Sequence, residues 1–240
     1  IRNLPFYAPH FVETVLRRQA SELSPTHTGS TEKTAIKTNL NLRLQLALEK
    51  NLKAYLISKN QVGAHNGAMM VINYETMNIE ALIGSNDYQD RIIEGQVNGT
   101  IAKRSPGSTL KPLLYALALD QGLITPMTLL KDTPKSFGGF EPENFDQNFS
   151  GPISATDALI HSRNVPAVTL DSQIKSPSFH DFLSEFGISD LKTQKHYGLS
   201  LSLGGAEVTM EELVSLYALL ANLGERKKIN WFESAKATPF

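Results

Sequence analysis

The chain has 240 residues, of which 41% are hydrophobic and 20% charged, so it can bury the core of one large domain or two small ones. The formal net charge of −1 mixes both signs and offers no basic face, which argues against nucleic-acid binding. The sequence contains no cysteine, which excludes disulfides, thiolate metal sites and a cysteine nucleophile.

The N-terminal part of the chain has the composition of a linker. Residues 1–20 combine prolines with a short predicted helix, and residues 21–34 form a polar stretch rich in serine and threonine. We therefore expect an N-terminal linker segment over residues 1–35 and a domain over residues 36–240. No apolar run approaches the roughly 20 residues of a membrane span, so any targeting or anchoring segment is expected upstream of Ile1.

The next two segments predict a helix and a hairpin. Residues 41–57 mix apolar and charged positions in the manner of an amphipathic helix. The apolar positions that mark this helix are Leu42, Leu46, Tyr55 and Leu56. Residues 67–84 contain two short apolar runs around a polar turn, which predicts a β-hairpin and one edge of a sheet.

Downstream, capping boxes predict helices. In each box a serine or threonine is followed three residues later by an acidic residue, ahead of an apolar run. The boxes are Ser154 with Asp157, Ser178 with Asp181, and Thr209 with Glu212. Gly187 and Gly224 are candidate stop signals for the last two helices. A hairpin followed mostly by helices, with no βαβ repeat, predicts an α+β fold in which an antiparallel sheet packs with a mainly helical subdomain.

The segment RSPGSTLKPLLYALAL, residues 104–119, places prolines around the start of a long apolar helix. Pro112 has no N–H and its ring excludes the preceding turn, so this helix cannot begin much before Ser108. The Ser108 hydroxyl would then lie beside free backbone N–H groups and the positive end of the helix dipole, where an oxyanion is stabilised. Lys111 lies one turn further on the same face, within reach of that hydroxyl.

A base at Lys111 must be neutral, which requires its pKa to fall from about 10.4 to near 7. Partial burial in a cleft, with another cation nearby, is the arrangement that lowers a lysine pKa so far. The Ser-x-x-Lys spacing alone is not specific, because it also occurs at Ser30 and Ser172, and a capping serine beside a solvated lysine is the alternative interpretation. Of the three serines, only Ser108 follows a breaker and opens an apolar helix.

A second group of polar residues lies in HSRNVPA, residues 161–167, after the helix capped by Ser154. Ser162 and Asn164 combine a hydroxyl with a carboxamide, which can relay a proton and hold a peptide amide. The same Ser-x-Asn pattern begins at Ser58, so a turn capped by polar side chains is the alternative interpretation.

Together, the Ser-x-x-Lys and Ser-x-Asn motifs in this order resemble the transpeptidase domain of penicillin-binding proteins. The surrounding sequence is similar to class A, bifunctional members, and residues 4–16 resemble their 1C branch. The resemblance spans nearly the whole chain and includes RSPGSTLKPLLYALALDQGLI from residue 104, FEPENF at 140–145, GPISATDALIHSRNVPAV at 151–168 and LSLGGAEVTMEEL at 201–213. It implies a partial β-lactamase/transpeptidase-like fold, with the first hairpin present and the C-terminal strands missing.

The resemblance also implies a role for each motif residue. Ser108 would attack the penultimate D-Ala of a D-Ala-D-Ala stem peptide and form an acyl-enzyme, with Lys111 as general base. Ser162 would pass the proton toward the leaving amine, and Asn164 would hold the bound peptide and help to position Lys111. An acceptor amine from a neighbouring stem would close a peptidoglycan cross-link on the periplasmic side of the bacterial inner membrane. β-Lactam antibiotics would acylate the same serine, and no cofactor or metal is implied.

Two departures from the family leave alternatives open. The Lys-Thr-Gly motif, whose strand supplies an oxyanion N–H and binds the substrate carboxylate, does not occur in the sequence. Truncation before that strand would explain this and would leave the fragment impaired. The glycosyltransferase domain and membrane anchor of the class are expected upstream. The first alternative is a D,D-carboxypeptidase or β-lactamase-like hydrolase, disfavoured because no Glu-x-x-Leu-Asn deacylation motif is found. The second is a non-catalytic module that binds or senses cell-wall peptide.

Overall fold

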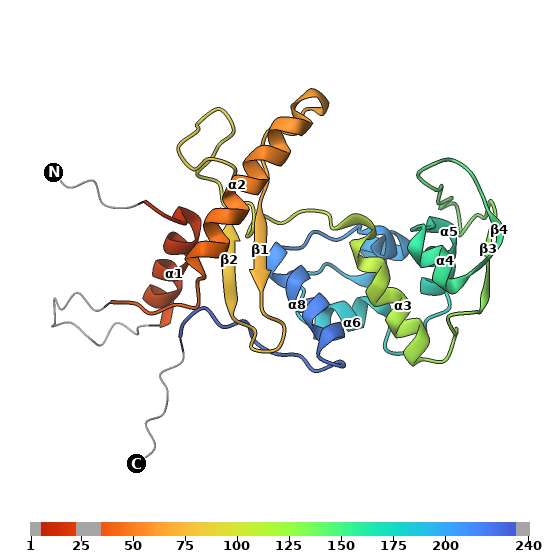
Figure 1. Ribbon diagram of the computed structural model, residues 1–240. Helices are drawn as coiled ribbons and strands as arrows, with labels where there is room; N and C mark the ends of the chain where they lie inside the picture. The colour runs from red at the N-terminus through yellow and green to blue at the C-terminus, as the bar shows by residue number, and fades with distance from the viewer. Residues whose placement is uncertain (1–5, 23–34, 234–240) are drawn as a thin grey trace, which may run out of the picture. The chain divides into compact units, whose positions relative to one another are not determined.

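The computed structural model describes residues 6–22 and 35–233, which fall into two compact units (Figure 1). The first unit comprises Ile1–Ala102 with Ala221–Phe240, and the second comprises Lys103–Leu220. Residues 1–5 and 23–34 of the predicted linker lie outside the described residues, and the domain boundary at residue 35 stays a prediction. Within the described ranges, no helix combines the length and apolar character needed to cross a bilayer.

The first unit is built on the antiparallel hairpin that the sequence predicts. Its elements are α1 (Pro9–Glu22), α2 (Leu42–Lys59), the 3₁₀ helix η1 (Asn60–Val62), β1 (Met69–Ile72) and β2 (Ile79–Ile83). The strands pair Met69 with Ile83, and an irregularity between Val71 and Ile72 shifts the register. Both α1 and α2 pack against β2, and α2 runs along the hairpin in Figure 1.

The predicted helix over residues 41–57 is present as α2, but most of the apolar positions that marked it are exposed. Of the four, only Leu56 is buried, whereas Leu42, Leu46 and Tyr55 are 42%, 40% and 57% exposed. The buried side instead includes Gln45, which is 1% exposed. The Gln45 amide donates to the Leu82 carbonyl at 2.9 Å and accepts from the Leu82 N–H at 2.8 Å. The Gln45 amide can be buried because it bonds both backbone groups of a strand residue. Hydrophobic periodicity cannot identify such a position, because its side chain is polar.

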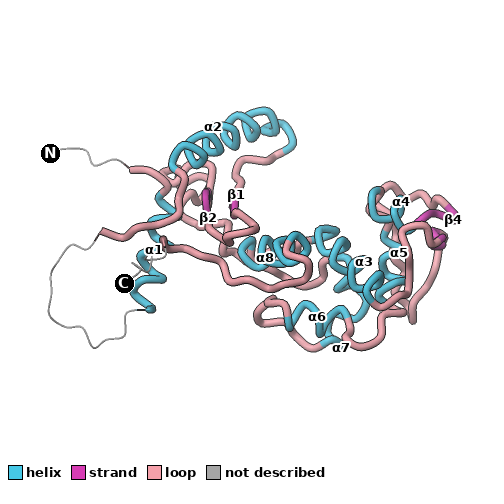
Figure 2. Tube along the Cα trace, turned by 60° about the horizontal axis from the view of Figure 1, so that its bottom comes forward, coloured by secondary structure: helices cyan, strands magenta, loops and turns pink. Residues whose placement is uncertain are grey.

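The second unit is mainly helical, with one short antiparallel sheet. Its elements are the 3₁₀ helix η2 (Gly107–Leu110), α3 (Lys111–Asp120), β3 (Leu129–Asp132), β4 (Gly151–Ser154), α4 (Ala155–Ile160), α5 (Asn164–Asp171), α6 (Phe179–Glu185), α7 (Gln194–Tyr197), the 3₁₀ helix η3 (Gly198–Leu203) and α8 (Met210–Ala221). Helix α3 packs against α5, and Figure 2 shows the two side by side. The two units together confirm the predicted α+β class.

Helix α3 forms the centre of the core of the second unit. Leu113, Leu114 and Ala118 are fully buried at 0% exposure. A helix that is apolar on nearly all sides has to be covered on all sides, and α3 is packed by α4, α5 and η3. The predicted capping boxes are complete at α6 and α8, where side chains and backbone N–H groups bond reciprocally, whereas at α4 the serine accepts the backbone N–H of Asp157 and donates its hydroxyl to the Asp157 carboxylate. The serine or threonine in each is Ser154, Ser178 and Thr209.

The sheet formed by β3 and β4 is a feature that the sequence does not predict. Leu129 pairs with Ser154, and Asp132 pairs with Gly151. Each strand has only four residues, too few for a clear alternating pattern, and the long loop 133–150 separates them. This sheet matters for the site because Asp132, its last residue on β3, is fully buried.

Candidate active site

A 3₁₀ turn carries Ser108 into the start of α3. The backbone N–H of Lys111 donates to the Ser108 carbonyl, three residues earlier. In an α-helix that carbonyl would be bonded by residue 112, but Pro112 has no N–H and its ring would clash there. The chain therefore makes the tighter 3₁₀ bond, and the α-helix begins at Lys111. Ser108 is exposed in the turn before it, and the predicted limit on where the helix begins is confirmed.

Gly204 braces the backbone just before Ser108. A Cβ at Gly204 would lie 2.3 Å from the nitrogen and 2.4 Å from the Cα of Gly107, and Gly204 has a φ of +88°. Only glycine tolerates both the close approach and this φ. Ser105 also donates its hydroxyl to the Gly204 carbonyl at 2.7 Å. The segment 201–213, which carries part of the family resemblance, therefore packs directly against the turn that presents the predicted nucleophile.

The side chain of Lys111 is 1% exposed, and its amine lies among three oxygen atoms. Nζ is 2.6 Å from the Ser162 carbonyl oxygen, 3.1 Å from the Ser162 hydroxyl and 2.6 Å from Oδ1 of Asn164. Three of the four predicted site residues are thus brought together, although Lys111 and Ser162 are 51 positions apart. Ser108 lies on the turn that immediately precedes Lys111.

Burial, followed by the smaller effect of the positive charge of Arg163, lowers the pKa of the Lys111 amine to about 8. Burial acts because an ammonium group loses its hydration in a low-dielectric site, and a neighbouring cation adds repulsion. Burial and a nearby cation are therefore both present at Lys111, although its pKa of about 8 stays above the expected value near 7.

The turn between α4 and α5 aims the oxygen atoms at Lys111. Ser162 has a left-handed φ of +53°, which is uncommon for a residue other than glycine. The N–H groups of Ser162 and Arg163 bond back to the carbonyls of Leu159 and Ala158 at 3.0 and 2.8 Å, which satisfies the end of α4. Helix α5 then begins at Asn164. The side chains of Ser162, before Arg163, and Asn164, after it, therefore both reach Lys111.

The middle residue of the turn, Arg163, makes a buried ion pair that the sequence did not reveal. Arg163 is 7% exposed, and its Nε lies 2.7 Å from Oδ2 of Asp132, which is 0% exposed. Burial opposes the ionisation of Asp132, but hydrogen bonds from Asn144, the Ser150 N–H and Arg163 outweigh it and hold the pKa of Asp132 below its usual value.

Residues of loop 133–150 hold Asn164 in place through hydrogen bonds. Asn144 accepts the backbone N–H of Asn164 at 2.7 Å and donates to Oδ1 of Asp132 at 2.8 Å. The side-chain amide of Asn164 donates to the Glu143 carbonyl at 2.6 Å. Both Glu143 and Asn144 belong to the FEPENF stretch, which the sequence marked only as part of a resemblance. Arg163 lay between two motif residues, but no pattern linked it to Asp132.

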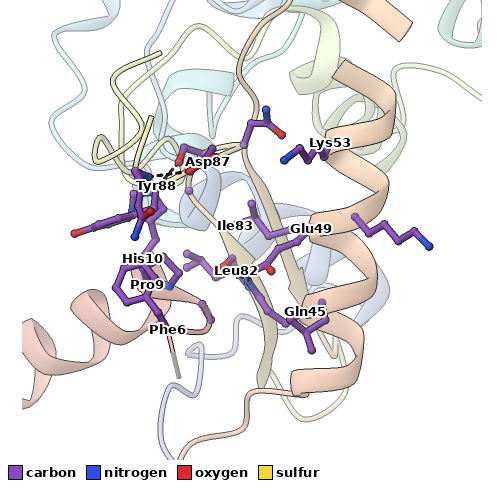
Figure 3. A pocket seen from close by; sticks show the side chains of 17 residues that line it. Phe6, Pro9, His10, Gln45, Glu49, Lys53, Leu82, Ile83, Asp87 and Tyr88 are labelled. Atoms are coloured by element: carbon purple, nitrogen blue, oxygen red, sulfur yellow. Dashed lines mark hydrogen bonds between the residues drawn. The ribbon is translucent and has the colours of Figure 1, made fainter. Parts of the chain in front are cut away.

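A separate hollow of about 550 Å³ lies in the first unit, between the start of α1, α2 and the end of β2 (Figure 3). Its wall includes His10, which is 3% exposed and bonds through Nε2 to the Gly95 carbonyl at 2.9 Å. Burial lowers the pKa of His10, and its ring packs edge-on against Tyr88. Glu49 and Lys53 of α2 contribute charge to the wall. Among the described residues that line this hollow, none belongs to either predicted motif.

Comparison with known proteins agrees with the geometry of the second unit. Residues 67–238 match the family described as the penicillin binding protein transpeptidase domain. The chain is 36% identical over 232 residues to penicillin-binding protein 1C of Escherichia coli (strain K12), covering 95% of this chain and 28% of that protein. It is 37% identical over 142 residues to penicillin-binding protein 1F of Bacillus subtilis (strain 168), covering 59% and 19%. The chain therefore spans less than a third of either relative.

Among solved structures, that of the PonA1 protein from Mycobacterium tuberculosis in complex with penicillin V has a TM-score of 0.77. It is 19% identical in sequence and covers 95% of this chain and 62% of that one, which shows a shared fold. The family match extends over more than half of the chain and includes all four motif residues. The chain therefore belongs to the penicillin-binding protein transpeptidase domain family.

Proposed function

We propose that the second unit carries the acylation machinery of a serine D,D-transpeptidase, which cross-links peptidoglycan stem peptides through an acyl-enzyme on Ser108. The observation that carries this proposal is the environment of the Lys111 amine, which is buried, has a pKa of about 8 and follows Ser108 by one turn. At pH 7 about one tenth of such amines are neutral, against roughly one in a few thousand for an exposed lysine.

In the acylation step, Oγ of Ser108 attacks the carbonyl carbon of the penultimate D-Ala, and its proton passes to the neutral amine of Lys111. A C–O bond forms, and the negative charge on the carbonyl oxygen lies near the positive N-terminal end of the dipole of α3. The C–N bond to the terminal D-Ala then breaks. The leaving nitrogen takes a proton from Lys111, relayed by the Ser162 hydroxyl that lies 3.1 Å from Nζ.

Asn164 holds both the base and the substrate. Its Oδ1 accepts from Lys111, and one of its two amide N–H bonds is directed to the Glu143 carbonyl. The second amide N–H can therefore bind a peptide carbonyl. In the transfer step, the acceptor amine attacks the ester carbonyl, a C–N bond forms, and the C–O bond to Ser108 breaks. The amine's proton passes through Lys111 back to Ser108, which restores the starting state.

The proposed reaction implies which molecules bind to the site and where the protein acts. The donor is a D-Ala-D-Ala stem peptide, the acceptor is a side-chain amine of a second stem, and a β-lactam is a substrate analogue that leaves Ser108 acylated. We further infer that the reaction takes place on the periplasmic side of the bacterial inner membrane, and the likeness to penicillin-binding protein 1C of Escherichia coli supports this inference.

Labelling with a fluorescent penicillin tests the nucleophile. We expect the complete protein to be labelled and Ser108→Ala to be unlabelled. Ser172→Ala is a matched control, because Ser172 shares the Ser-x-x-Lys spacing but bonds the Thr169 carbonyl at the end of α5. Labelling that persists in Ser108→Ala, or that disappears equally in Ser172→Ala, contradicts the assignment.

Product analysis separates transfer from the two alternatives. We expect a D-Ala-D-Ala stem peptide to release D-Ala and to form a cross-linked dimer when an acceptor amine is added. A hydrolase would release D-Ala at the same rate with or without the acceptor and form no dimer. A binding or sensing module would bind the stem peptide and release nothing.

A further inference from the structure

Arg163 lies between Ser162 and Asn164 in the turn that joins α4 to α5 and is buried, although its own hydrogen bonds are directed away from Lys111. Its neighbours Ser162 and Asn164 supply every oxygen atom that the Lys111 amine contacts. Arg163 itself is 7% exposed and makes its contacts with Asp132 and loop 133–150. A charged side chain is rarely buried to this extent unless it is paired, so its position calls for a physical reason.

Every nitrogen of the Arg163 guanidinium has an acceptor. Nε donates to Asp132 at 2.7 Å, one terminal nitrogen donates to both carboxylate oxygens of Asp146 at 3.1 and 3.0 Å, and the other donates to the Asn148 carbonyl. The planar guanidinium presents its donors in a fixed fork, so acceptors in three directions fix its orientation. Arg163 is therefore held rigidly.

Because Arg163 is held in place, the backbone on either side of it is held as well, including the groups that contact Lys111. The Ser162 carbonyl that accepts from Lys111 belongs to the peptide bond leading into Arg163, and Asn164 follows directly. Asn144 links the ion pair to the turn, because its side chain donates to Asp132 and accepts the backbone N–H of Asn164. Moving Arg163 would therefore displace both oxygen-bearing groups at once.

The charge of Arg163 also acts on Lys111 directly. Other titratable groups on the elements packed around Lys111 are Tyr115 on α3, Asp132 on β3, Asp146 in the loop, Asp157 and His161 at α4, and Asp171 on α5. Burial and the charge of Arg163 are nevertheless the causes that lower the pKa of Lys111. Asp157 is engaged in the cap of α4, and Asp132 and Asp146 are paired with Arg163 itself.

We propose that Arg163 is a positioning residue of this site: held by Asp132, it fixes the turn that carries Ser162 and Asn164 and places a permanent positive charge beside the Lys111 amine. The inference rests on the proposed function, since it assigns Arg163 a part in preparing the base for acylation. Arg163 acts through Lys111 and does not contact the substrate.

Charge and anchoring can be separated by substitution. Arg163→Gln removes the charge, so the pH at which acylation is half-maximal should rise by about one unit, and the rate at pH 7 should fall about tenfold. Arg163→Lys keeps the positive charge but loses the fixed set of guanidinium hydrogen bonds. It should therefore slow acylation while the pH of half-maximal acylation stays near the wild-type value. Lys103→Gln is a matched control, because it removes a positive charge from the same unit at the exposed Lys103–Asp190 pair.

The experiment measures the rate of acylation of the complete protein by a fluorescent penicillin between pH 6 and pH 10. We expect the midpoint to rise in Arg163→Gln and to remain unchanged in Arg163→Lys and Lys103→Gln. Arg163→Gln leaves Asp132 buried without its partner and can unfold. The double variant Asp132→Asn with Arg163→Gln leaves no unpaired buried charge, and its midpoint should also lie above that of the wild type.

Two outcomes overturn the inference. The first is a wild-type midpoint in a folded Arg163→Gln or double variant, and the second is an equal rise in Lys103→Gln. Both presuppose that the wild-type protein is acylated at Ser108. A wild-type protein that is not acylated contradicts the proposed function instead, so the two failures are distinguishable.

Discussion

The amine of Lys111 lies 2.6 Å from Oδ1 of Asn164, although the two residues are 53 positions apart in the sequence. Lys111 opens α3 and Asn164 opens α5, and the two helices pack side by side. Packing of α3 against α5 therefore brings the two sequence motifs into one site. The energy for this arrangement comes from the apolar core around α3, since a buried amine is by itself unfavourable.

The pH dependence of acylation should report the Lys111 amine. Its pKa is lowered to about 8 in the folded protein, and the neutral form is the base. Acylation by a fluorescent penicillin should therefore be slow near pH 6, rise with pH and level off above about pH 9. A rate that does not change between pH 6 and pH 9 would show that Lys111 is not the base.

Two substitutions at Asn164 should differ in how they affect that pH profile. Asn164→Asp places a carboxylate 2.6 Å from the amine, which favours the ammonium form and should slow acylation at pH 7 about a hundredfold. Asn164→Ala removes a contact without adding charge, so its rate should fall while its pH midpoint stays near that of the wild type. Stopped-flow labelling across the pH range gives both quantities. Equal midpoints in the two variants would contradict the placement of Asn164 against the amine.

The stability of the fold should depend on Lys111 at alkaline pH. The folded-state pKa of about 8 lies below the unfolded value, so the buried ammonium destabilises the fold below pH 8. As pH rises from 8 toward 10, deprotonation relieves this, and the wild type should gain about 2 to 3 kcal/mol relative to Lys111→Met. Urea unfolding of both proteins at pH 7 and pH 10 measures the difference. A constant difference between the two pH values would show that Lys111 is not buried as described.

Gly204 should be intolerant of a side chain. Gly204→Ala adds a Cβ about 2.3 Å from the Gly107 backbone, which has to shift, and it also strains a φ of +88°. Gly122→Ala is the control, because Gly122 has a φ of +66° with no heavy atom within 4 Å of the added Cβ. We expect Gly122→Ala to lose about 1 kcal/mol of stability, and Gly204→Ala to lose more and also to slow acylation at Ser108. Unfolding and labelling of both variants test this, and equal effects would exclude a specific role for Gly204.

Local signals predicted the parts of the site that depend on neighbouring residues. Pro112 limited where α3 can begin, and the Ser154 cap preceded the helix that leads to Ser162. The same reasoning failed where distant segments decide the outcome. The ion pair between Arg163 and Asp132 joins residues 31 positions apart across a sheet too short to be predicted. Leu42 is exposed because the side of α2 that packs against the hairpin carries Gln45, Leu52 and Leu56 instead.

A direct titration of the Lys111 amine tests whether this amine is the buried base of the site. Carbon-13 labelling of lysine Cε in the complete protein gives a signal whose chemical shift follows protonation, and its loss in Lys111→Arg assigns it. We predict a midpoint near 8, as burial and the charge of Arg163 require. A midpoint near 10.4, the value of a solvated lysine, would contradict both the buried amine and its role as the base that activates Ser108.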